Sequence, residues 1–521
     1  MNSTSGITVS VWVDTVPLPQ YEPLFKDIET EVCIIGAGIT GLTCAYLLLK
    51  EGKKILIVDG GEVGGGETGR TTAHITNVID DRYFIIEKLH GERGAQLAAE
   101  SQIAAVNMIE EIVRSESIDC DFERVTAYLF FSGEEKKKVI EAEYQACIKA
   151  GLKVEKQNSP PVIISNVVPC LEFPDQAQFH MTKYITGLAK AIVEKGGKIY
   201  AQTHINNIEV KDDAVVISTQ NENRIKARDI IVATNSPVSN YVSVHLKQSP
   251  YRTYVIGIPI KKGSVAKGLF WDSEDPYHYV RLFERDTDDI LIIGGEDHKT
   301  GQEVDTDKHF TNLESWAKRW FKNIGVPLYK WSGQIIETVD NLSFIGLDPE
   351  QKEHVYIATG DSGMGITHAT FSAILLNDLI AGRENEWAKL YDPKRKTLRS
   401  AKEFMAGNLN VAAQYIELFT PGEIKDPEDI TPGEGAIIRK GLKKYAVYRT
   451  PEGSIHACSA SCTHLKGIVN WNSTEKTWDC PCHGARYDAF GKVLNGPAIN
   501  NLEEVDSTKI LHDPEEVHDK K

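Results

Sequence analysis

The chain has 521 residues, of which 41% are hydrophobic and 25% charged, a composition typical of globular proteins and not of disordered, collagen-like or coiled-coil chains. Its length suits three or four domains of about 150 residues. The 58 basic and 74 acidic side chains give a formal net charge of −16, so nucleic acid is not an expected partner. No apolar run approaches the roughly 20 residues of a transmembrane segment. Since the N-terminus carries no basic and apolar leader, we expect a cytoplasmic protein.

Near the start of the chain, GAGITG fits G-x-G-x-x-G between a β-branched run and an apolar periodic segment, which predicts a βαβ unit. Gly36 would make the tight turn, Gly38 would let the backbone approach a pyrophosphate, and Gly41 would allow close helix–strand packing. The helix that starts at Ile39 would offer free N–H groups to phosphates. Asp59, at the end of the second strand, would bind an adenosine ribose and repel the extra phosphate of NADP. The pattern predicts a dinucleotide site, with a purely structural turn as the alternative.

The remaining elements alternate along the chain. Helices are predicted at about residues 83–115, 134–151, 181–197 and 369–382, and strands at about 198–219, 229–237, 250–300 and 355–360. A stretch with two proline-containing turns follows and is interpreted as a linker. The last ninety residues are predicted to hold short strands and turns.

Three segments resemble the FAD-binding segments of the amino-acid and amine oxidase family, which includes D-amino acid oxidase, glycine oxidase and sarcosine oxidase. They are GGETGRTTAHIT (65–76), DIIVATNSP (229–237) and VYIATGDSGMGITHAT (355–370). The resemblance covers roughly residues 28–385. It implies that the dinucleotide is FAD and that the last turn lays backbone N–H groups against the flavin. The FAD-binding residues that it implies are Thr71, Thr72, Ala73, Ile205, Thr234, Gly360, Gly363, Met364, Gly365 and Thr367.

The predicted substrate pocket departs from this family at one position. Members that act on simple amino acids carry G-L-R-P-x-T-x-D, whose arginine clamps the substrate carboxylate. The matching stretch here is GQIIETVD, with Ile335 at the place of the arginine. A plain α-amino acid bound in the usual way is therefore not expected. The resemblance gives Arg252, Tyr279 and Arg281 as catalytic candidates, with a surface or packing role as the alternative for each.

Four of the nine cysteines fall within residues 458–482, which indicates a metal site and not a disulfide framework. Cys462 and His464 form C-x-H, and Cys480 and His483 belong to C-P-C-H-G. By count alone these residues could bind zinc. Their flanking loops resemble a Rieske [2Fe-2S] domain. That resemblance implies that the two thiolates bind one iron and the two imidazoles bind the other.

The chain differs from respiratory Rieske proteins around the cluster. Those proteins carry a second cysteine at the place of Gly467, which forms a disulfide with the equivalent of Cys482, and a serine at the place of Ala485. Cys482 is therefore expected to be unpaired, and Tyr487 keeps the other hydroxyl donor. With fewer hydrogen bonds to sulfur, we expect a potential in the lower part of the roughly −150 to +300 mV Rieske range. Cys458 is expected to be a small buried residue.

The predicted fold is an α/β Rossmann-like FAD-binding domain interleaved with an antiparallel-sheet α+β substrate domain, plus a small all-β Rieske domain. The predicted boundaries are 28–390 for the oxidoreductase, with FAD-binding parts at about 28–80, 165–240 and 345–385 and substrate parts at about 81–164 and 241–344, then 391–428 for a linker and 429–513 for the Rieske domain.

The function that this organisation predicts is oxidation of a small amine or amino-acid-like substrate at a C–N bond. Electrons would pass from FAD to the [2Fe-2S] cluster and on to an external electron carrier. A bound acceptor competes with oxygen, which favours a dehydrogenase over an oxidase. Two alternatives stay open: a reductase in which electrons enter at the cluster, and a non-catalytic redox or electron-transfer module. A terminal Rieske oxygenase is not expected, because no evident second His/carboxylate iron site is present.

Overall fold

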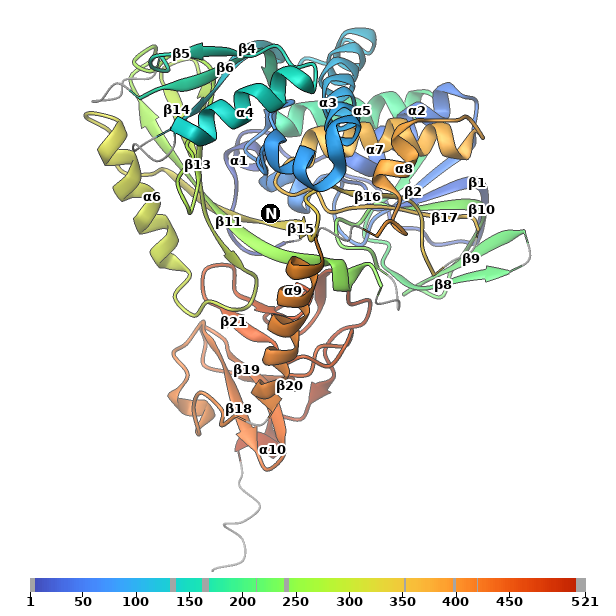
Figure 1. Ribbon diagram of the computed structural model, residues 1–521. Coiled ribbons are helices and arrows are strands. Elements are labelled where there is room, and N and C mark those ends of the chain that lie inside the picture. Colours follow the sequence, from blue (N-terminus) through green and yellow to red (C-terminus); the bar gives the residue numbers. More distant parts are fainter. Residues whose placement is uncertain are drawn as a thin grey trace, which may run out of the picture.

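The computed structural model describes residues 5–131, 137–161, 168–211, 213–238, 243–350, 353–396, 400–418 and 420–511. Figure 1 shows a larger body above, built from the chain up to residue 396, and a smaller C-terminal domain below, built from residues 420–511. Residues 134–136 of one predicted helix and residues 512–513 of the predicted C-terminal domain lie outside the described residues.

The first layer of the larger body is an eight-stranded sheet with a parallel centre. Its order is β16-β17-β10-β1-β2-β7, with β8 and β9 continuing from β10. The strands are β1 (Ile28–Ile35), β2 (Ile55–Val58), β7 (Lys198–Tyr200), β8 (Ile205–Lys211), β9 (Ala214–Thr219), β10 (Arg224–Val232), β16 (Phe344–Leu347) and β17 (Val355–Thr359). The parallel strands are buried because helices cover them.

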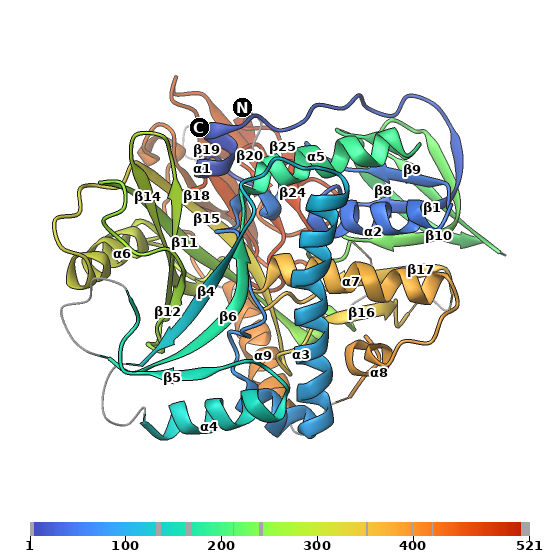
Figure 2. The ribbon, with the colours of Figure 1, turned by 90° about the horizontal axis from the view of Figure 1, so that it is seen from above.

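Helices α2 (Ile39–Lys50), α5 (Met181–Glu194) and α7 (Gly365–Ile380) pack beside this sheet, and α2 contacts the other two (Figure 2). The long helix α3 (Tyr83–Ser115) contacts α7 and also α4 (Lys137–Lys149) and α8 (Trp387–Tyr391). The apolar periodicity therefore predicted helices where the structure has them.

The second layer is a nine-stranded, mainly antiparallel sheet in the order β15-β11-β14-β13-β12-β4-β6-β3, with β5 beside β6. Its strands are β3 (His74–Ile75), β4 (Glu123–Phe130), β5 (Glu155–Gln157), β6 (Cys170–Gln178), β11 (Gln248–Ile260), β12 (Leu269–Trp271), β13 (His278–Glu284), β14 (Asp289–Lys299) and β15 (Tyr329–Thr338). Strand β6 falls in the stretch predicted for the FAD-binding part, yet it pairs with β4 here. That boundary is corrected, because hydrogen bonding to β4 places the strand in the second sheet.

Helix α6 (Asp307–Trp320) was not predicted from the sequence. It covers β11 and β14 and buries Phe310, Leu313, Trp316 and Ala317 at helical spacing. Its mixture of buried and charged residues gives a weaker apolar run than the predicted helices have.

The C-terminal domain consists of two four-stranded antiparallel sheets. One contains β18 (Gly435–Lys440), β19 (Lys443–Arg449), β20 (Ile455–Ser459) and β25 (Glu504–Val505), and the other β21 (Asn470–Asn472), β22 (Thr477–Asp479), β23 (Arg486–Asp488) and β24 (Val493–Asn495). A bridge between Ile424 and Ile438 brings the start of the domain ahead of the predicted residue 429. A short helix, α10 (Thr508–Leu511), closes the described chain.

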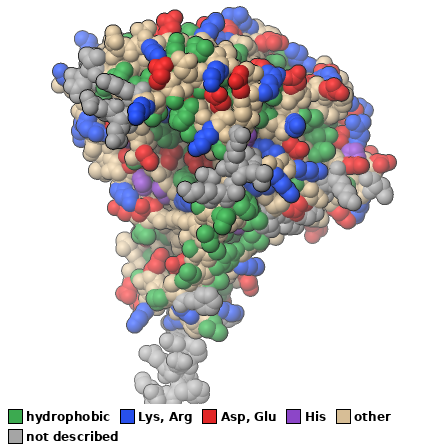
Figure 3. Space-filling model, viewed as in Figure 1, with side chains coloured by type: hydrophobic (Ala, Val, Ile, Leu, Met, Phe, Trp, Pro, Cys, Tyr) green, Lys and Arg blue, Asp and Glu red, His purple; other side chains and the backbone are tan. Residues whose placement is uncertain are grey.

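The stretch predicted as a linker contains helix α9 (Ala401–Gln414), which runs from the larger body onto the C-terminal domain (Figure 1). Apolar side chains gather along this face in Figure 3, and α9 exposes Met405 and Leu409 there. Among the described residues, no helix combines the length and apolar character needed to cross a membrane.

The N-terminal segment lies at the junction of the two bodies (Figure 1). The Ile7 N–H donates to the Glu475 carbonyl at 3.2 Å, and the Thr8 hydroxyl donates to the Glu475 carboxylate at 2.6 Å. Helix α1 (Val11–Thr15) follows, and Trp12 is fully buried in the larger body. Residues at the two ends of the sequence therefore meet in one interface.

Candidate functional site

A central cavity of about 850 Å³ lies between the two sheets of the larger body, and the C-terminal domain supplies part of its wall. The β1–α2 turn, the end of β2 and the turn after β17 contribute to it, as the sequence predicted for a dinucleotide site. The predicted cofactor-binding residues are therefore expected to line this cavity.

Close backbone contacts leave no room for a side chain at two positions of the β1–α2 turn. Gly36 has φ +108°, and a Cβ on it would lie 2.4 Å from the Ala233 carbonyl oxygen. A Cβ on Gly41 would lie 1.9 Å from the Gly36 carbonyl oxygen. Gly38 caps α2 without a side-chain hydrogen bond of its own, and Thr40 in the first turn of α2 lines the cavity. This geometry fits a phosphate-bearing ligand.

Asp59 lies at the predicted place and lines the cavity. Its carboxylate accepts hydrogen bonds from the Ala37 N–H at 2.6 Å and the Gly61 N–H at 2.7 Å. Burial raises the pKa of Asp59, and the two backbone donors oppose that rise. Through these two hydrogen bonds the carboxylate holds the glycine turn in place at the predicted ribose site.

Eleven of the predicted cofactor-binding residues line the cavity: Gly36, Gly38, Ile39, Asp59, Thr71, Thr72, Ile205, Thr234, Gly363, Met364 and Gly365. The other four, Gly41, Ala73, Gly360 and Thr367, lie behind its wall.

Each of these four has a structural contact that explains its place. Gly41 packs against Gly36, and the Ala73 carbonyl accepts a hydrogen bond from Arg281 at 2.6 Å. A Cβ on Gly360 would lie 2.4 Å from the Thr338 methyl group, so this glycine permits a close turn. The Thr367 hydroxyl faces the Met364 carbonyl inside α7. They shape the cavity from behind, which for Gly41 is the close packing that the sequence predicted and for the other three corrects the expectation of direct contact.

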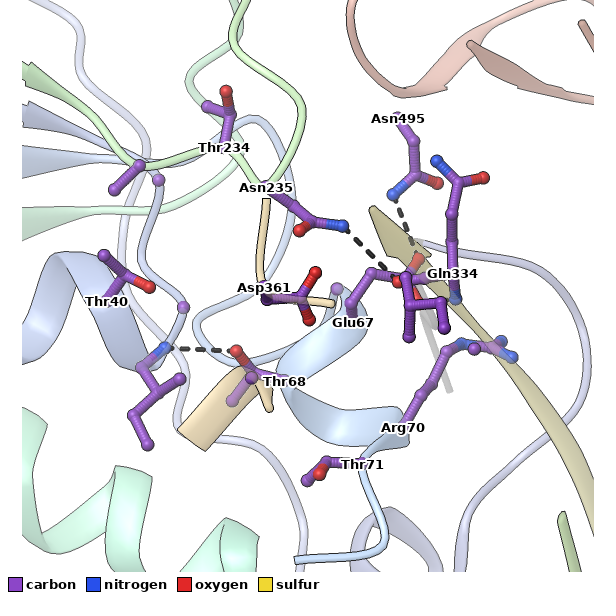
Figure 4. Close-up of a pocket in the computed structure, with 18 of the residues that line it drawn as sticks. Thr40, Glu67, Thr68, Arg70, Thr71, Thr234, Asn235, Gln334, Asp361 and Asn495 are labelled. Atoms are coloured by element: carbon purple, nitrogen blue, oxygen red, sulfur yellow. Dashed lines mark hydrogen bonds between the residues drawn. The ribbon is translucent and has the colours of Figure 1, made fainter. Parts of the chain in front are cut away.

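Sequence reasoning missed several polar residues that converge on the cavity. Figure 4 shows Asn235, Gln334 and Asn495 gathered around Glu67. Glu67 accepts from the Gln334 N–H at 2.6 Å and from Asn495 Nδ2 at 3.1 Å. Thr68 accepts from the Ile39 N–H at 3.1 Å, which ties the short helix η1 (Glu67–Arg70) to the start of α2. The glycine-rich GGETGR stretch was the available signal for η1.

The end of the cavity next to the Gly363 turn is aromatic and acidic. Trp271, Tyr277, Tyr279 and His74 line it together with Asp80 and Asp361. A Cβ on Gly363 would lie 2.7 Å from Asp80 Oδ2, so this carboxyl group touches the turn.

Burial raises the pKa of several carboxyl groups at this end. The pKa of Asp80 and that of Asp361 rise to about 6. Behind them, the pKa of Asp297 and that of Glu337 rise to about 7, because burial and the neighbouring carboxylates both disfavour their charge. The cavity wall contributed here by the described residues of the second sheet contains no lysine or arginine. This end of the cavity is suited to a cationic group.

Of the three catalytic candidates, Tyr279 lines the cavity and donates to or accepts from the Thr253 hydroxyl at 2.8 Å. The expectation for the two arginines is corrected. Arg252 is fully buried between the two bodies, where its guanidinium lies 3.1 Å from Glu475 Oε1. Arg281 donates to the carbonyls of Ala73 and Phe179 behind the wall.

The C-terminal domain brings together the four predicted cluster ligands. Cys462 and Cys480 are buried in its core, and the rings of His464 and His483 lie 5.2 Å apart. Within the described residues, neither ring nitrogen of His464 has a hydrogen-bond partner, and nor does Nε2 of His483. Burial lowers the pKa of both histidines to about 4, so both are neutral at pH 7. Two thiols and two neutral imidazoles in this arrangement fit a [2Fe-2S] cluster.

The residues around these ligands lie as the sequence indicated. A Cβ on Gly467 would be 2.5 Å from Cys482 Sγ, so a glycine stands where a pairing cysteine would fit, and Cys482 is free. The Tyr487 hydroxyl lies 3.2 Å from Cys462 Sγ. Ala485 is buried and offers no hydroxyl. Cys458 is a buried residue whose thiol faces the Phe490 carbonyl.

The two imidazoles face His245 of the larger body, and His464 is partly exposed. The ring of His245, in the short helix η3 (His245–Lys247), lies 5.1 Å from His464 and 6.2 Å from His483. His245 is 3% exposed and His483 is 5% exposed. The predicted cluster therefore lies against the larger body.

Comparisons with known proteins agree with this arrangement. The family described as FAD dependent oxidoreductase (DAO) matches residues 31–379, and the Rieske [2Fe-2S] domain family matches residues 421–506. YhfW of Bacillus subtilis, named as a Rieske 2Fe-2S iron-sulfur protein, is 32% identical over 95% of this chain and 97% of its own. The gamma-glutamylputrescine oxidoreductase of Escherichia coli is 24% identical over 70% of this chain and 86% of its own.

Among solved structures, glycine oxidase from Geobacillus kaustophilus is similar in fold, with a TM-score of 0.61. The match covers 71% of this chain and 99% of that one, at 17% sequence identity.

Proposed function

Because the chain belongs to the family of FAD-dependent oxidoreductases and carries a C-terminal Rieske [2Fe-2S] domain, we propose that it dehydrogenates a small amine at a C–N bond and relays the electrons through the cluster to an external carrier. One observation carries this proposal: residues of the Rieske domain line the same cavity as the glycine turn. The Rieske domain therefore forms part of the wall of the predicted FAD cavity, while its four predicted cluster ligands do not line that wall. An internal acceptor at this position competes with oxygen, which favours a dehydrogenase.

The geometry supports an assignment of the residues that would hold the cofactors. Gly36, Gly38 and Asp59 would hold the FAD phosphates and ribose, and Gly363 to Gly365 would lie at the flavin. Cys462, His464, Cys480 and His483 would bind the cluster. When bound, FAD supplies a two-electron acceptor and the cluster supplies a one-electron carrier.

The substrate class is inferred from the charges at the flavin end. Ile335 lines the cavity where an arginine would bind a carboxylate, and Asp80 and Asp361 supply negative charge instead. A cationic amine is attracted by these groups, whereas a substrate carboxylate would be repelled. One relative is named gamma-glutamylputrescine oxidoreductase, and the putrescine end of that compound is a primary amine remote from its carboxylate, which supports an amine as the oxidised group.

The same carboxylates are suited to accept a proton. A protonated amine must lose a proton from its nitrogen before the hydrogen of a neighbouring C–H bond can leave as a hydride. With a pKa raised to about 6, Asp80 or Asp361 can take that proton near neutral pH. Tyr277, 3.4 Å from Asp80 Oδ2, can donate a hydrogen bond to the carboxylate and hold it toward the Gly363 turn.

The proposal is tested by anaerobic mixing of the holoenzyme with monoamines, diamines, N-methyl amino acids and plain amino acids. We expect amines without a carboxylate to bleach the flavin, followed by the electron paramagnetic resonance signal of a reduced Rieske cluster. Binding of the cationic amine should weaken as the pH falls through about 7 and then 6, because Asp297, Glu337, Asp80 and Asp361 become protonated.

Bleaching by plain amino acids alone would contradict the proposed substrate class. Reduction of the flavin by a reduced ferredoxin, with no response to any amine, would favour the reductase. Bound cofactors that respond to neither would favour an electron-transfer module.

A further inference from the structure

Gln334 connects the central cavity to the loop that carries the predicted cluster ligand His483. It lies on β15, is 2% exposed and lines the central cavity. Its backbone is fixed there, because its N–H donates to Glu67 and its carbonyl accepts from Asn235 at 3.5 Å (Figure 4). Its side-chain Nε2 donates to the Gly484 carbonyl at 3.1 Å. Gly484 directly follows the cluster ligand His483, so one side chain spans from the cavity to the ligand loop.

The backbone of the His483–Gly484 loop packs directly against the larger body. Gly484 has φ +74°, and a Cβ on it would lie 2.5 Å from Pro250 Cβ and 3.0 Å from Gln334 Nε2. A side chain at this place would push the loop away from β11 and β15. His245 also packs against both imidazoles. These contacts leave no layer of water between the His483–Gly484 loop and the larger body at this place.

Buried charges fix the two bodies in this position. Glu475 of the Rieske domain is fully buried and pairs with Arg70 at 2.8 Å and Arg252 at 3.1 Å, both from the larger body. Arg486 of the Rieske domain lies 3.9 Å from Glu67. Separating the bodies would leave charged groups without partners, which is costly. These ion pairs therefore hold the Rieske domain against the larger body.

We propose that Gln334 is the positioning residue that couples flavin and cluster, holding the His483–Gly484 loop against the flavin side of the cavity. The inference rests on the proposed function, from which it takes the direction of electron flow. For each amine oxidised, two electrons and two protons leave the reduced flavin; the electrons pass one at a time to the oxidised cluster, and two oxidised molecules of a one-electron carrier remove them.

The test uses the full-length holoenzyme and two matched substitutions. Gln334→Leu removes the bond to Gly484. Gln302→Leu removes a bond of the same kind, since Gln302 Nε2 donates to the Pro481 carbonyl of the same loop at 3.3 Å but lies outside the cavity. A flash of light with deazaflavin injects electrons, and the transfer from flavin to cluster is followed by absorbance. No amine is needed, so the result does not depend on the substrate class.

We expect Gln334→Leu to slow the transfer about tenfold, as loss of a residue next to a metal ligand commonly does. Gln302→Leu should leave the rate unchanged. Redox titration and the paramagnetic resonance spectrum are measured for both variants, and the expected result is slower transfer at unaltered cluster potential and g values. If Gln334 only supported the structure around the cluster, its replacement would shift the cluster potential or the paramagnetic resonance spectrum.

Equal rates in all three proteins, or equal slowing in both variants, would overturn the role of Gln334. If the unaltered holoenzyme passes no electron between the centres, the relay itself is overturned. Flavin bleaching by amines would still stand in that case, so the two proposals fail separately.

Discussion

Glu475 remains charged although its side chain is fully buried. Burial by itself would raise the pKa of this carboxyl group, but Arg70, Arg252 and Arg486 outweigh burial and lower the pKa to about 2. Because this value lies below the ordinary 4.5, the charged form stabilises the folded chain above about pH 4.5. That contribution is lost as the pH falls toward 2. The contact between the two bodies is thus stable at neutral pH and weakened by acid.

Replacing this charge tests the ion-pair cluster. Glu475→Gln keeps the size of the side chain but leaves the arginines uncompensated, so we expect the free energy of unfolding to fall by about 3–5 kcal/mol. Urea unfolding at neutral pH measures it. The control is Asp175→Asn, which breaks an exposed pair with Lys153 and should cost less than about 1 kcal/mol. Equal losses in both variants would contradict the importance of burial here.

A second prediction concerns the hydroxyl group next to a cluster ligand. Tyr487 lies 3.2 Å from Cys462 Sγ, and an O–H donor at sulfur stabilises the reduced cluster. Tyr487→Phe should lower the reduction potential by roughly 40 mV, the equivalent of about 1 kcal/mol for one electron. Protein-film voltammetry measures the potential. Tyr448→Phe, in the same domain but packed on Trp471, should leave it unchanged, and an equal shift in that control would sink the assignment.

Neighbouring residues on one strand explain why a predicted site residue lies outside the cavity. Thr253 lines the cavity, whereas Arg252 points into the interface, because successive side chains of a strand face opposite sides. Sequence resemblance located the strand but did not show which of its side chains face the cavity. Gly36 and Cys462 were easier to predict, since their partners lie in short segments with fixed spacing. Gln334 was missed because its partner, Gly484, is distant in the sequence and carries no side chain.

At the scale of elements, the fold could be predicted where periodicity is strong and local. The apolar pattern predicted a helix over residues 83–115, and α3 has the same bounds. It could not place β6, whose assignment depends on pairing with β4. Nor did the sequence indicate that the N-terminal segment is an element of the interface. Those relations are set by long-range packing, which no single segment encodes.

The N-terminal segment allows an element-scale prediction. Gly6 has φ +124°, and a Cβ there would lie 2.2 Å from Glu475 Oε2. Gly6→Ala should therefore displace the segment from the Rieske domain and cost about 1–3 kcal/mol of stability, as overpacking commonly does. Thermal unfolding of the holoenzyme measures the loss. Gly325→Ala, where a Cβ would meet open space, is the control and should change little; an unchanged midpoint for Gly6→Ala would contradict this anchoring role.

At the scale of the whole molecule, the two domains share both a buried ion-pair cluster and a cofactor cavity. Val493, Leu494, Asn495 and Gly496 of the Rieske domain line the same cavity as Asp59, so FAD would contact both bodies. A ligand that binds only the assembled form stabilises it by mass action, by about 2.7 kcal/mol at a concentration 100 times its dissociation constant. FAD binding and domain docking are therefore expected to be linked.

This linkage predicts that flavin and cluster are lost together on heating. Flavin fluorescence and the visible circular dichroism of the cluster should change at one midpoint, and added FAD should raise both equally, because neither domain leaves the interface before the other unfolds. In Glu475→Gln the two signals should separate, with flavin released while the cluster is still intact, since the ion pairs no longer hold the cavity wall in place. Separate midpoints in the unaltered protein would contradict the coupling, and would mean that the Rieske domain docks without contributing to FAD retention.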